Sequence, residues 1–185
     1  MEKALPEFGH QIEGPLVLKP TVNSDMRGSF SRLFCPEELA VLKVPFVPVQ
    51  MSLSRNFAQY TLRGMHHQNG RWAEEKIVRV TRGSIFDVAI DLRENSPTYC
   101  KWCATELSAD NMWSFYIPRG FSHGFLSLEA DTDVLYQIDS IYEPGHAEGV
   151  RWDDPAFGIK WPEQPVVIGE RDAGYAEIDS TVVKK

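Results

Sequence analysis

The sequence predicts an all-β protein, a double-sheet jelly roll with a few short helices, formed by a single domain over residues 1–185. Its dominant hydrophobic periodicity is two, which is typical of strands rather than helices. Many short candidate strands follow one another closely, separated by residues that favour turns. Polar and reactive side chains fall inside these strands, a pattern that a small barrel enclosing a cavity needs and an immunoglobulin-like sandwich with a dry core does not.

The individual elements follow from local signals. Turns are predicted where Asn, Asp, Gly and Pro cluster, as at 82–83 and 143–145. A short helix is expected over 36–42 because Pro36 suits a first helical turn, and a second helical turn is expected over 172–178. The expected strands are Leu16–Leu18, Phe30–Leu33, Phe46–Ser52, Thr61–His67, Lys76–Thr81, Ser84–Leu92, Thr98–Glu106, Ser114–Ile117, Gly124–Leu128 and Asp133–Ile138.

Composition and charge narrow the functional class. The chain has 19 basic and 26 acidic residues and a net charge of −7, which argues against a nucleic-acid-binding surface. A few arginines in one cavity would still suffice to bind an anionic small molecule. The sequence has no run of 18 apolar residues that could span a membrane, and its first ten residues lack the apolar stretch of a secretory signal. With three cysteines, an odd number, we expect a reducing compartment, the cytoplasm.

Two of the cysteines, Cys100 and Cys103, have the C-x-x-C spacing of thioredoxin-like redox sites. A redox site of that kind belongs at the N-terminus of a helix, where a thiolate is stabilised. These cysteines lie instead in a stretch rich in strand-forming residues, where a period of two sends the thiols to opposite faces. We therefore expect buried, reduced thiols.

The richest stretch in chemical groups is Thr61–Lys76, TLRGMHHQNGRWAEEK. Strict alternation would place His66 and Arg63 on opposite faces of a strand. Gly64 permits a bulge or kink that would bring them into one cavity, so we expect a backbone irregularity at or beside it. Lys76 begins the next expected strand and shares a face with Val78 and Val80. This position suits either a cation in a cavity or a lysine whose stem packs on the core while its amine reaches solvent.

The stretch YIPRGFSHGF, residues 116–125, matches the PxGxxH signature of cupin-type jelly rolls. In metal-binding cupins this histidine is a ligand together with an HxH pair and a glutamate. Here His66 and His67 are adjacent, so at most one can face a metal from a regular strand, and no metal site is expected. His123 then needs another partner, for which Asp87 is the candidate.

Aromatic and charged groups near the C-terminus complete the candidate site. Tyr136 shares a strand face with apolar residues, which suits a core tyrosine or a general acid placed across a substrate from a base. Tyr142 could wall the same opening. Asp172 could accept a hydrogen bond from one imidazole nitrogen of His66 and raise the basicity of the other.

Taken together, the motifs resemble those of the dTDP-4-dehydrorhamnose 3,5-epimerase family, from about Val22 to Asp172. The resemblance implies a cupin-like jelly roll, a homodimer, no metal or organic cofactor, and a nucleoside-diphosphate 4-keto-6-deoxy sugar as substrate, used in deoxysugar and cell-surface polysaccharide biosynthesis. The matching stretches are DMRGSF, TLRGMHHQ, EKIVRVTRGSIFDVAIDLRENSPTY, LSADN, YIPRGFSHGF, LYQIDSIYEPG, VRWDDPAFGIKWP and ERD.

The same resemblance implies a role for individual residues. His66 matches the catalytic base, Asp172 the aspartate that orients it, and Tyr136 the general acid on the other side of the sugar. Lys76 matches a lysine near the C4 oxygen, and His123 a cavity histidine paired with Asp87. The residues that match substrate- or diphosphate-binding positions are Arg27, Phe30, Arg63, Gln68, Glu148 and Arg171.

Several positions depart from the family pattern. Arg32 stands where the family commonly has glutamate, and Pro48 and Gln50 fall in a stretch that is usually VQxNxSxS. A longer stretch, RNFAQY, precedes Thr61. The catalytic set is kept while parts of the substrate wall differ, so the reaction class is better supported than the sugar or the nucleotide base.

Four interpretations stay open on the sequence. The first is an epimerase that inverts C3 and C5, or one of them alone. The second is a 3,4-ketoisomerase on the same class of substrate, which need not use Tyr136. The third is a non-enzymatic protein that binds sugar nucleotides, and the fourth is a metal-dependent cupin such as a dioxygenase, which the missing HxH pair disfavours.

Overall fold

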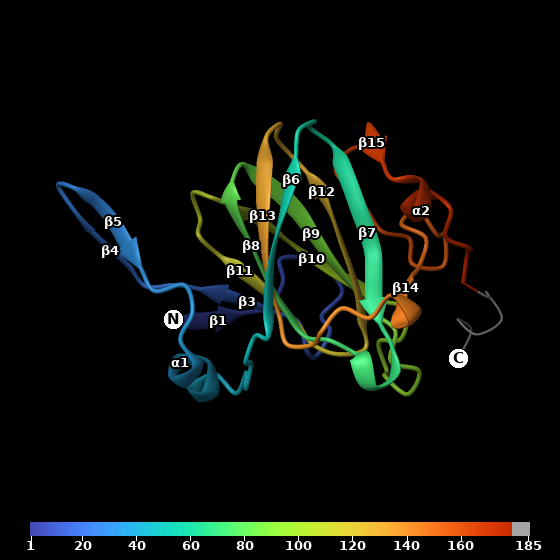
Figure 1. Cartoon of the computed structure of the whole chain (residues 1–185), viewed down its shortest axis with the longest axis horizontal. Helices are drawn as coiled ribbons and strands as arrows, with labels where there is room; N and C mark the ends of the chain where they lie inside the picture. The colour runs from blue at the N-terminus through green and yellow to red at the C-terminus, as the bar shows by residue number, and fades with distance from the viewer. Residues whose placement is uncertain (179–185) are drawn as a thin grey trace.

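The computed structural model describes residues 1–178, which form two facing β-sheets with short helices outside them (Figure 1). The strands are β1 (Glu2–Ala4), β2 (Phe8–Gly9), β3 (Leu16–Lys19), β4 (Val22–Asp25), β5 (Gly28–Ser31), β6 (Gln50–Asn56), β7 (Thr61–Gln68), β8 (Lys76–Arg82), β9 (Ser84–Asp91), β10 (Trp102–Ser108), β11 (Ser114–Ile117), β12 (Phe121–Ser127), β13 (Thr132–Ile138), β14 (Ala147–Gly149) and β15 (Val167–Ile168). The α-helices are α1 (Pro36–Val41) and α2 (Glu170–Ala173), and 3-10 turns cover Gly70–Trp72 and Pro144–His146.

The strand order explains how the two sheets face each other. Sheet A has the order β1-β3-β11-β8-β13-β6, and sheet B has the order β14-β7-β12-β9-β10-β2. Neighbours within these two orders are antiparallel, and β15 adds a parallel pairing with β7. Consecutive strands repeatedly cross between sheets, so the two sheets enclose one interior. The predicted all-β architecture is confirmed.

One end of this interior is a dry core. Val78 and Val80 of β8 and Val134 of β13 pack against Phe125 of β12 and Ile85 of β9 from the opposite sheet. Because side chains alternate along a strand, the same inward faces continue toward the other end of the sheets. The residues there are polar, and they form the cavity described below.

Apolar clusters also cover part of the outer face of each sheet, although Met51 and Leu53 on the edge strand β6 stay exposed. Leu39 of α1 and Phe46 pack with Ile77 and Tyr116 over sheet A. On sheet B, Phe157 and its neighbours from the stretch after β14 cover Met65, Phe86 and Trp102 among others. With apolar residues buried on both faces, the central strands read as nearly continuous buried runs.

A hairpin of β4 and β5 extends away from both sheets, at the far left of Figure 1. Its side chains are largely exposed; Phe30 is 74% exposed. The hairpin carries Arg27 at its turn, bound to Asp25 with a 2.5 Å contact between Nη2 and Oδ2.

Some element boundaries differ from the sequence prediction. The strand expected over 46–52 is β6 at Gln50–Asn56, and that expected over 98–106 is β10 at Trp102–Ser108, because residues 97–100 form turns with Cys100 at φ 61°. The helical turn expected over 172–178 lies at Glu170–Ala173. Strands β1, β2, β4, β14 and β15 were not predicted, since they are two to four residues long and mostly exposed or half-buried.

The thiols are free, as expected. Cys103 is in the core between the sheets and Cys100 in the cluster outside sheet B, so the two lie on opposite faces. Burial raises the pKa of Cys103 to about 12 and also raises that of Cys100. Within residues 1–178, none of the helices has the length and apolar character needed to cross a bilayer.

Candidate active site

The polar end of the interior holds a cavity of about 290 Å³ between the two sheets. Sheet A and sheet B supply opposite walls, and the segment around β14 and α2 supplies part of the rim. The lining residues are Gln50, Ser52, Ser54, Arg63, His66, His67, Gln68, Glu74, Lys76, His123, Tyr136, Ile138, Tyr142, Ala147, Glu148 and Arg171.

Sheet A places Lys76 and Tyr136 in this cavity. Lys76 is the first residue of β8 and has the same inward orientation as Val78 and Val80 of the dry core. Tyr136 of β13 lies opposite Val78 in the ladder and packs against the same core. One face of β8 therefore contributes Val78 and Val80 to the core and Lys76 to the cavity, where Lys76 is buried.

Sheet B places His66 across the cavity, held by Asp172 of α2. The Nε2 atom of His66 is 2.7 Å from Oδ1 of Asp172, and Oδ2 of Asp172 accepts a 2.9 Å hydrogen bond from the Gly64 N–H. Burial opposes ionisation of Asp172, but the hydrogen bonds from His66 and Gly64 outweigh it and lower the pKa of the carboxyl. An ionised Asp172 accepts a hydrogen bond from Nε2–H, which leaves Nδ1 with a free lone pair.

The expected irregularity at Gly64 is present. Gly64 has φ +126°, the Gly64–Met65 peptide is cis, and the pairing of β7 with β12 changes register between His123 and Phe125. A Cβ atom on Gly64 would lie 2.5 Å from Cα of Gly124, so a larger residue does not fit. As a result, Arg63 and His66 line the same cavity although they are an odd number of residues apart.

A second imidazole, His123 of β12, is paired with a buried carboxylate. Its Nε2 atom is 2.6 Å from Oδ1 of Asp87, and both side chains are almost fully buried. Burial raises the pKa of Asp87, and His123 opposes this rise. The ring of His123 packs edge-on against that of Tyr136, with 6.0 Å between centroids. Burial, and then the charge of Asp87, raise the pKa of Tyr136, so its hydroxyl is protonated at neutral pH.

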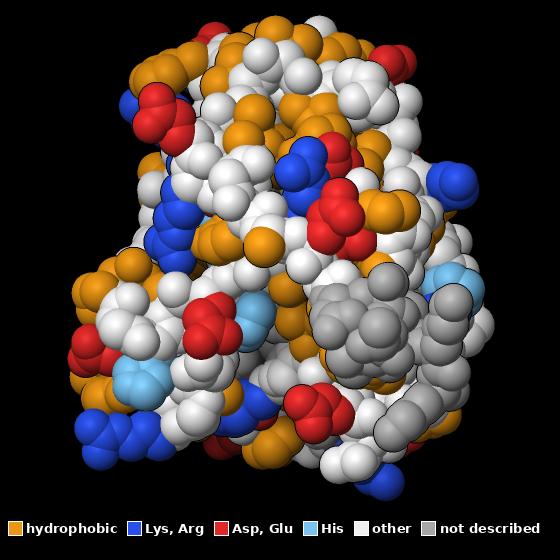
Figure 2. All heavy atoms as spheres, turned by 90° about the vertical axis from the view of Figure 1, so that its right-hand side faces the viewer, with side chains coloured by type: hydrophobic (Ala, Val, Ile, Leu, Met, Phe, Trp, Pro, Cys, Tyr) orange, Lys and Arg blue, Asp and Glu red, His pale blue; other side chains and the backbone are white. Residues whose placement is uncertain are grey.

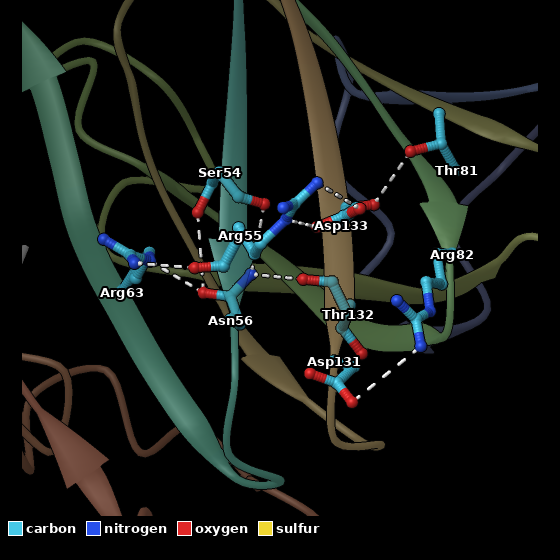
Figure 3. Close-up of polar contacts among 9 residues, drawn as sticks. All are labelled: Ser54, Arg55, Asn56, Arg63, Thr81, Arg82, Asp131, Thr132 and Asp133. Carbon is cyan, nitrogen blue, oxygen red and sulfur yellow. Dashed lines mark hydrogen bonds and ion pairs between the residues drawn. The ribbon is translucent and has the colours of Figure 1, made fainter.

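Arg63 enters the cavity from β7 and is held by Asn56 of β6 (Figure 3). Its Nε donates a 2.7 Å hydrogen bond to Oδ1 of Asn56. The amide of Asn56 is itself fixed, because Nδ2 donates to the backbone carbonyl of Thr132 at 3.0 Å and the side chain is buried. The guanidinium group is thus oriented before any ligand binds, which suits recognition of an anion.

The face that carries β15 and α2 shows acidic and basic side chains mixed together (Figure 2). The cations that line the cavity are Arg63 and Arg171, which are exposed to solvent, and Lys76, which is buried. Within residues 1–178, no three His, Cys, Asp or Glu side chains are grouped so that they could hold a metal ion.

Comparison with known proteins identifies the family. Residues 9–180 match the model of the dTDP-4-dehydrorhamnose 3,5-epimerase family. A dTDP-4-dehydrorhamnose 3,5-epimerase of Sinorhizobium fredii is 42% identical over 165 residues, which cover 88% of this chain and 84% of the relative. The chain belongs to the dTDP-4-dehydrorhamnose 3,5-epimerase family. It is accordingly an enzyme of the isomerase class.

Solved structures of the family share the fold. A dTDP-4-dehydrorhamnose 3,5-epimerase from Bacillus anthracis, determined with TDP and pyrophosphate bound, superposes with a TM-score of 0.87 at 33% identity, covering 91% of this chain and 99% of that one. A 3'-monoepimerase from Streptomyces bikiniensis in complex with dTDP-quinovose has a TM-score of 0.84 at 28% identity, covering 94% and 87%. The predicted cupin-like jelly roll is confirmed.

Within this family fold, most predicted site residues come together. Nine of the predicted residues line the cavity directly: His66, Tyr136, Lys76, Gln68, Arg63, His123, Tyr142, Glu148 and Arg171. Asp172 and Asp87 stand behind His66 and His123 as their partners. Arg27 and Phe30 are on the projecting hairpin and do not line the cavity of their own chain. Of the positions that depart from the family pattern, Gln50 lines the cavity. Arg32 lies outside the cavity and pairs with Glu38, with 2.8 Å between Nη1 and Oε1.

Sequence reasoning missed the two titratable cavity residues Glu74 and His67, and also Ser52, Ser54, Ile138 and Ala147. Glu74 lies 2.7 Å from the amine of Lys76 and is equally buried. The repeated acidic pair before Lys76 was a signal, but such pairs usually lie on solvated surfaces. His67 lines the cavity with its Nδ1 atom 3.2 Å from Oγ of Ser122, and burial lowers its pKa. No sequence signal predicted this, because strict alternation along a strand would send His67 to the face opposite His66.

Proposed function

We propose that this protein inverts C3, C5 or both in a nucleoside-diphosphate 4-keto-6-deoxyhexose without a metal or organic cofactor. The observation that carries the proposal is that His66 and Tyr136 line one cavity from opposite sheets. A base on one side of a sugar ring and an acid on the other are what inversion of a carbon centre requires.

His66 is the base in this mechanism. Hydrogens at C3 and C5 are acidic because the C4 ketone can take up the charge as an enolate. Asp172 accepts a hydrogen bond from the Nε2–H of His66, so Nδ1 is the atom that receives a proton from carbon. The imidazolium that forms is stabilised by the same carboxylate, which is ionised at neutral pH because its pKa is lowered.

Lys76 and Tyr136 complete the proton transfer. The ammonium group of Lys76 stabilises the enolate oxygen, a contribution typically of about 3–4 kcal/mol for one donor in an oxyanion site. Tyr136 returns a proton from the opposite face. Its raised pKa keeps the hydroxyl protonated at neutral pH, so the proton is available; although the raised pKa makes the phenol a weaker acid, the carbanion is a strong enough base to accept it.

The remaining residues position the substrate. Arg63 and Arg171 hold the diphosphate, with Gln68, Tyr142 and Glu148 at the sugar and the opening, and His123 with Asp87 supports the wall beside Tyr136. Arg27 and Phe30 are assigned as binding residues of a homodimer: the hairpin projects from both sheets (Figure 1) and does not line the cavity of its own chain, so the substrate they contact is the one bound by a second copy. Such contacts supply orientation rather than chemistry.

A single-centre epimerase is the second candidate. The related structure of a 3'-monoepimerase favours it, because that enzyme has the same fold at a similar level of identity. The two candidates differ only in whether one or both carbons lose and regain a hydrogen.

The test is solvent exchange. The protein is incubated in D₂O with dTDP-, CDP- and GDP-linked 4-keto-6-deoxyhexoses, and NMR reads deuterium and configuration at C3 and C5. Deuterium with inversion at both carbons supports the double epimerase, and at one carbon the monoepimerase. A product with the ketone moved to C3 identifies a ketoisomerase, and binding with no deuterium at either carbon refutes an enzymatic role on these substrates.

Tyr136→Phe sharpens the test. We expect exchange of substrate hydrogen to persist while inversion is lost, because the base is intact and the acid is gone. Tyr116→Phe is the matched control, since its hydroxyl contacts Glu75 outside the cavity. Full inversion by Tyr136→Phe would contradict the assigned role of Tyr136.

A further inference from the structure

Glu74 is a buried carboxylate in the cavity with no part in the mechanism above. It lies two residues before the start of β8 and lines the cavity, and its side chain is only 9% exposed, the same fraction as that of Lys76. A charged group removed from water needs polar partners that compensate for lost hydration. The partners of Glu74 therefore indicate what it does.

The carboxylate is held at both oxygens. Oε1 lies 2.7 Å from Nζ of Lys76, and Oε2 accepts a 2.8 Å hydrogen bond from Nε2 of Gln68. Gln68 is fixed in turn, because its Oε1 accepts the backbone N–H of Glu143 at 2.7 Å and its Nε2 also contacts the carbonyl of Ile141 at 3.2 Å. Gln68 therefore presents a donor to Glu74, and the direction of the carboxylate is set by the backbone of the rim.

Within residues 1–178, Lys76 forms its ion pair with Glu74. A lysine side chain has a flexible four-carbon stem and so many orientations for its ammonium group. An ammonium has three N–H donors, and the pair with Glu74 uses one of them. Fixing that donor fixes the stem and leaves two donors for the cavity.

We propose that Glu74 is a positioning residue that aims the ammonium group of Lys76 at the substrate. The inference rests on the proposed function, in which Lys76 meets the C4 oxygen of the sugar. Glu74 contributes through Lys76 and not through a proton transfer of its own. Its removal should therefore lower the rate of the chemical step more than it weakens substrate binding.

The experiment is a double-mutant cycle on the full chain, with kcat and KM measured by NMR for the substrate that shows exchange. Glu74→Ala should lower kcat about 10- to 100-fold and change KM less than about threefold. Lys76→Met removes the charge and nearly keeps the shape. In that background, adding Glu74→Ala should cost less than about twofold more, because nothing is left to position.

Two further variants keep the test sharp. Glu74→Gln keeps an acceptor for Lys76 but turns its amide donor toward Nε2 of Gln68, which is also a donor, so we expect a smaller loss, about three- to tenfold. It also replaces Glu74→Ala in the cycle if that variant does not fold. Glu75→Gln is the matched control: Glu75 pairs with Arg119 at 2.6 Å outside the cavity, and kcat should stay within about twofold.

Two results would overturn the inference: wild-type kcat in Glu74→Ala, or additive losses when Glu74 and Lys76 are both changed. The second result would mean that Glu74 acts on the substrate directly. Wild-type activity in Lys76→Met would instead remove the role that the proposed function gives to Lys76, and the positioning role of Glu74 would fall with it.

Discussion

Replacing Asp172 by asparagine tests the proposal that its pairing with His66 makes His66 a base. The change keeps size and shape but removes the charge that accepts the proton on Nε2 of His66. Oδ2 of Asp172 also accepts the N–H of Gly64, so an asparagine oxygen can serve only one of these two donors. If it faces Gly64, its NH₂ group donates to Nε2 and moves the imidazole proton to Nδ1, the atom that must receive the substrate hydrogen.

The size of the effect follows from these two contacts. The lost charge-assisted hydrogen bond is worth about 1.5–3 kcal/mol, and a donor left facing a donor costs about 1–3 kcal/mol. The side chain of His66 is 39% exposed, so water weakens both contributions, and the expected total is about 3 kcal/mol. At about 1.4 kcal/mol for each factor of ten, kcat should fall about 10²-fold.

The assay is the initial rate of deuterium uptake from D₂O into the substrate, read by NMR. Binding of dTDP, measured by calorimetry, should stay near the wild-type value because Asp172 does not line the cavity. Asp153→Asn is the control, since Asp153 pairs with Arg151 on the surface. A folded Asp172→Asn protein with exchange within threefold of wild type would refute the assignment of Asp172 as the group that orients His66.

Three other predictions concern stability and reactivity. Gly64→Ala should lower the free energy of unfolding by about 2–4 kcal/mol in urea titrations, because φ is +126° and a Cβ would meet Gly124 at 2.5 Å; an unchanged midpoint would contradict this. In native protein at pH 8, a thiol reagent should label Cys35 well before Cys103, whose pKa is raised to about 12, and rapid labelling of Cys103 would show that its burial is wrong. The folded pKa of Asp172 lies below its ordinary value of 3.8, so its ionisation stabilises the folded state at higher pH, and this stabilisation is lost as pH falls through the folded pKa. The difference in free energy of unfolding between wild type and Asp172→Asn should therefore shrink from pH 6 to pH 3.5. A constant difference would argue against the lowered pKa.

Much of the site was predictable because strands have a simple period. Lys76 shares a face with Val78 and Val80, so its inward direction follows from counting by two. Arg63 and His66 can share a cavity only if the strand between them is distorted, and Gly64 permits such a distortion. The predicted irregularity is present in β7. These predictions needed only covalent geometry and the hydrophobic pattern.

What the sequence did not predict depends on contacts between distant segments. Glu74 is bonded to Gln68, whose amide oxygen in turn accepts the backbone N–H of Glu143 in the rim after β13. The shift of β6 toward Asn56 has a similar origin, since its polar residues line a cavity whose other walls are remote in sequence. The direction of the hairpin that carries Phe30 likewise follows from tertiary structure rather than from local pattern.

The continuous inward face of β8 has a consequence for how active molecules arise during folding. A slip of one residue in its pairing with β13 would send Lys76 to the outside and, in the same step, pull Val78 and Val80 out of the core. Faulty pairing therefore cannot yield a stable but inactive molecule by this route. Recovered turnover after refolding should report the yield of the native fold, without a separate hidden population of well-packed, silent protein.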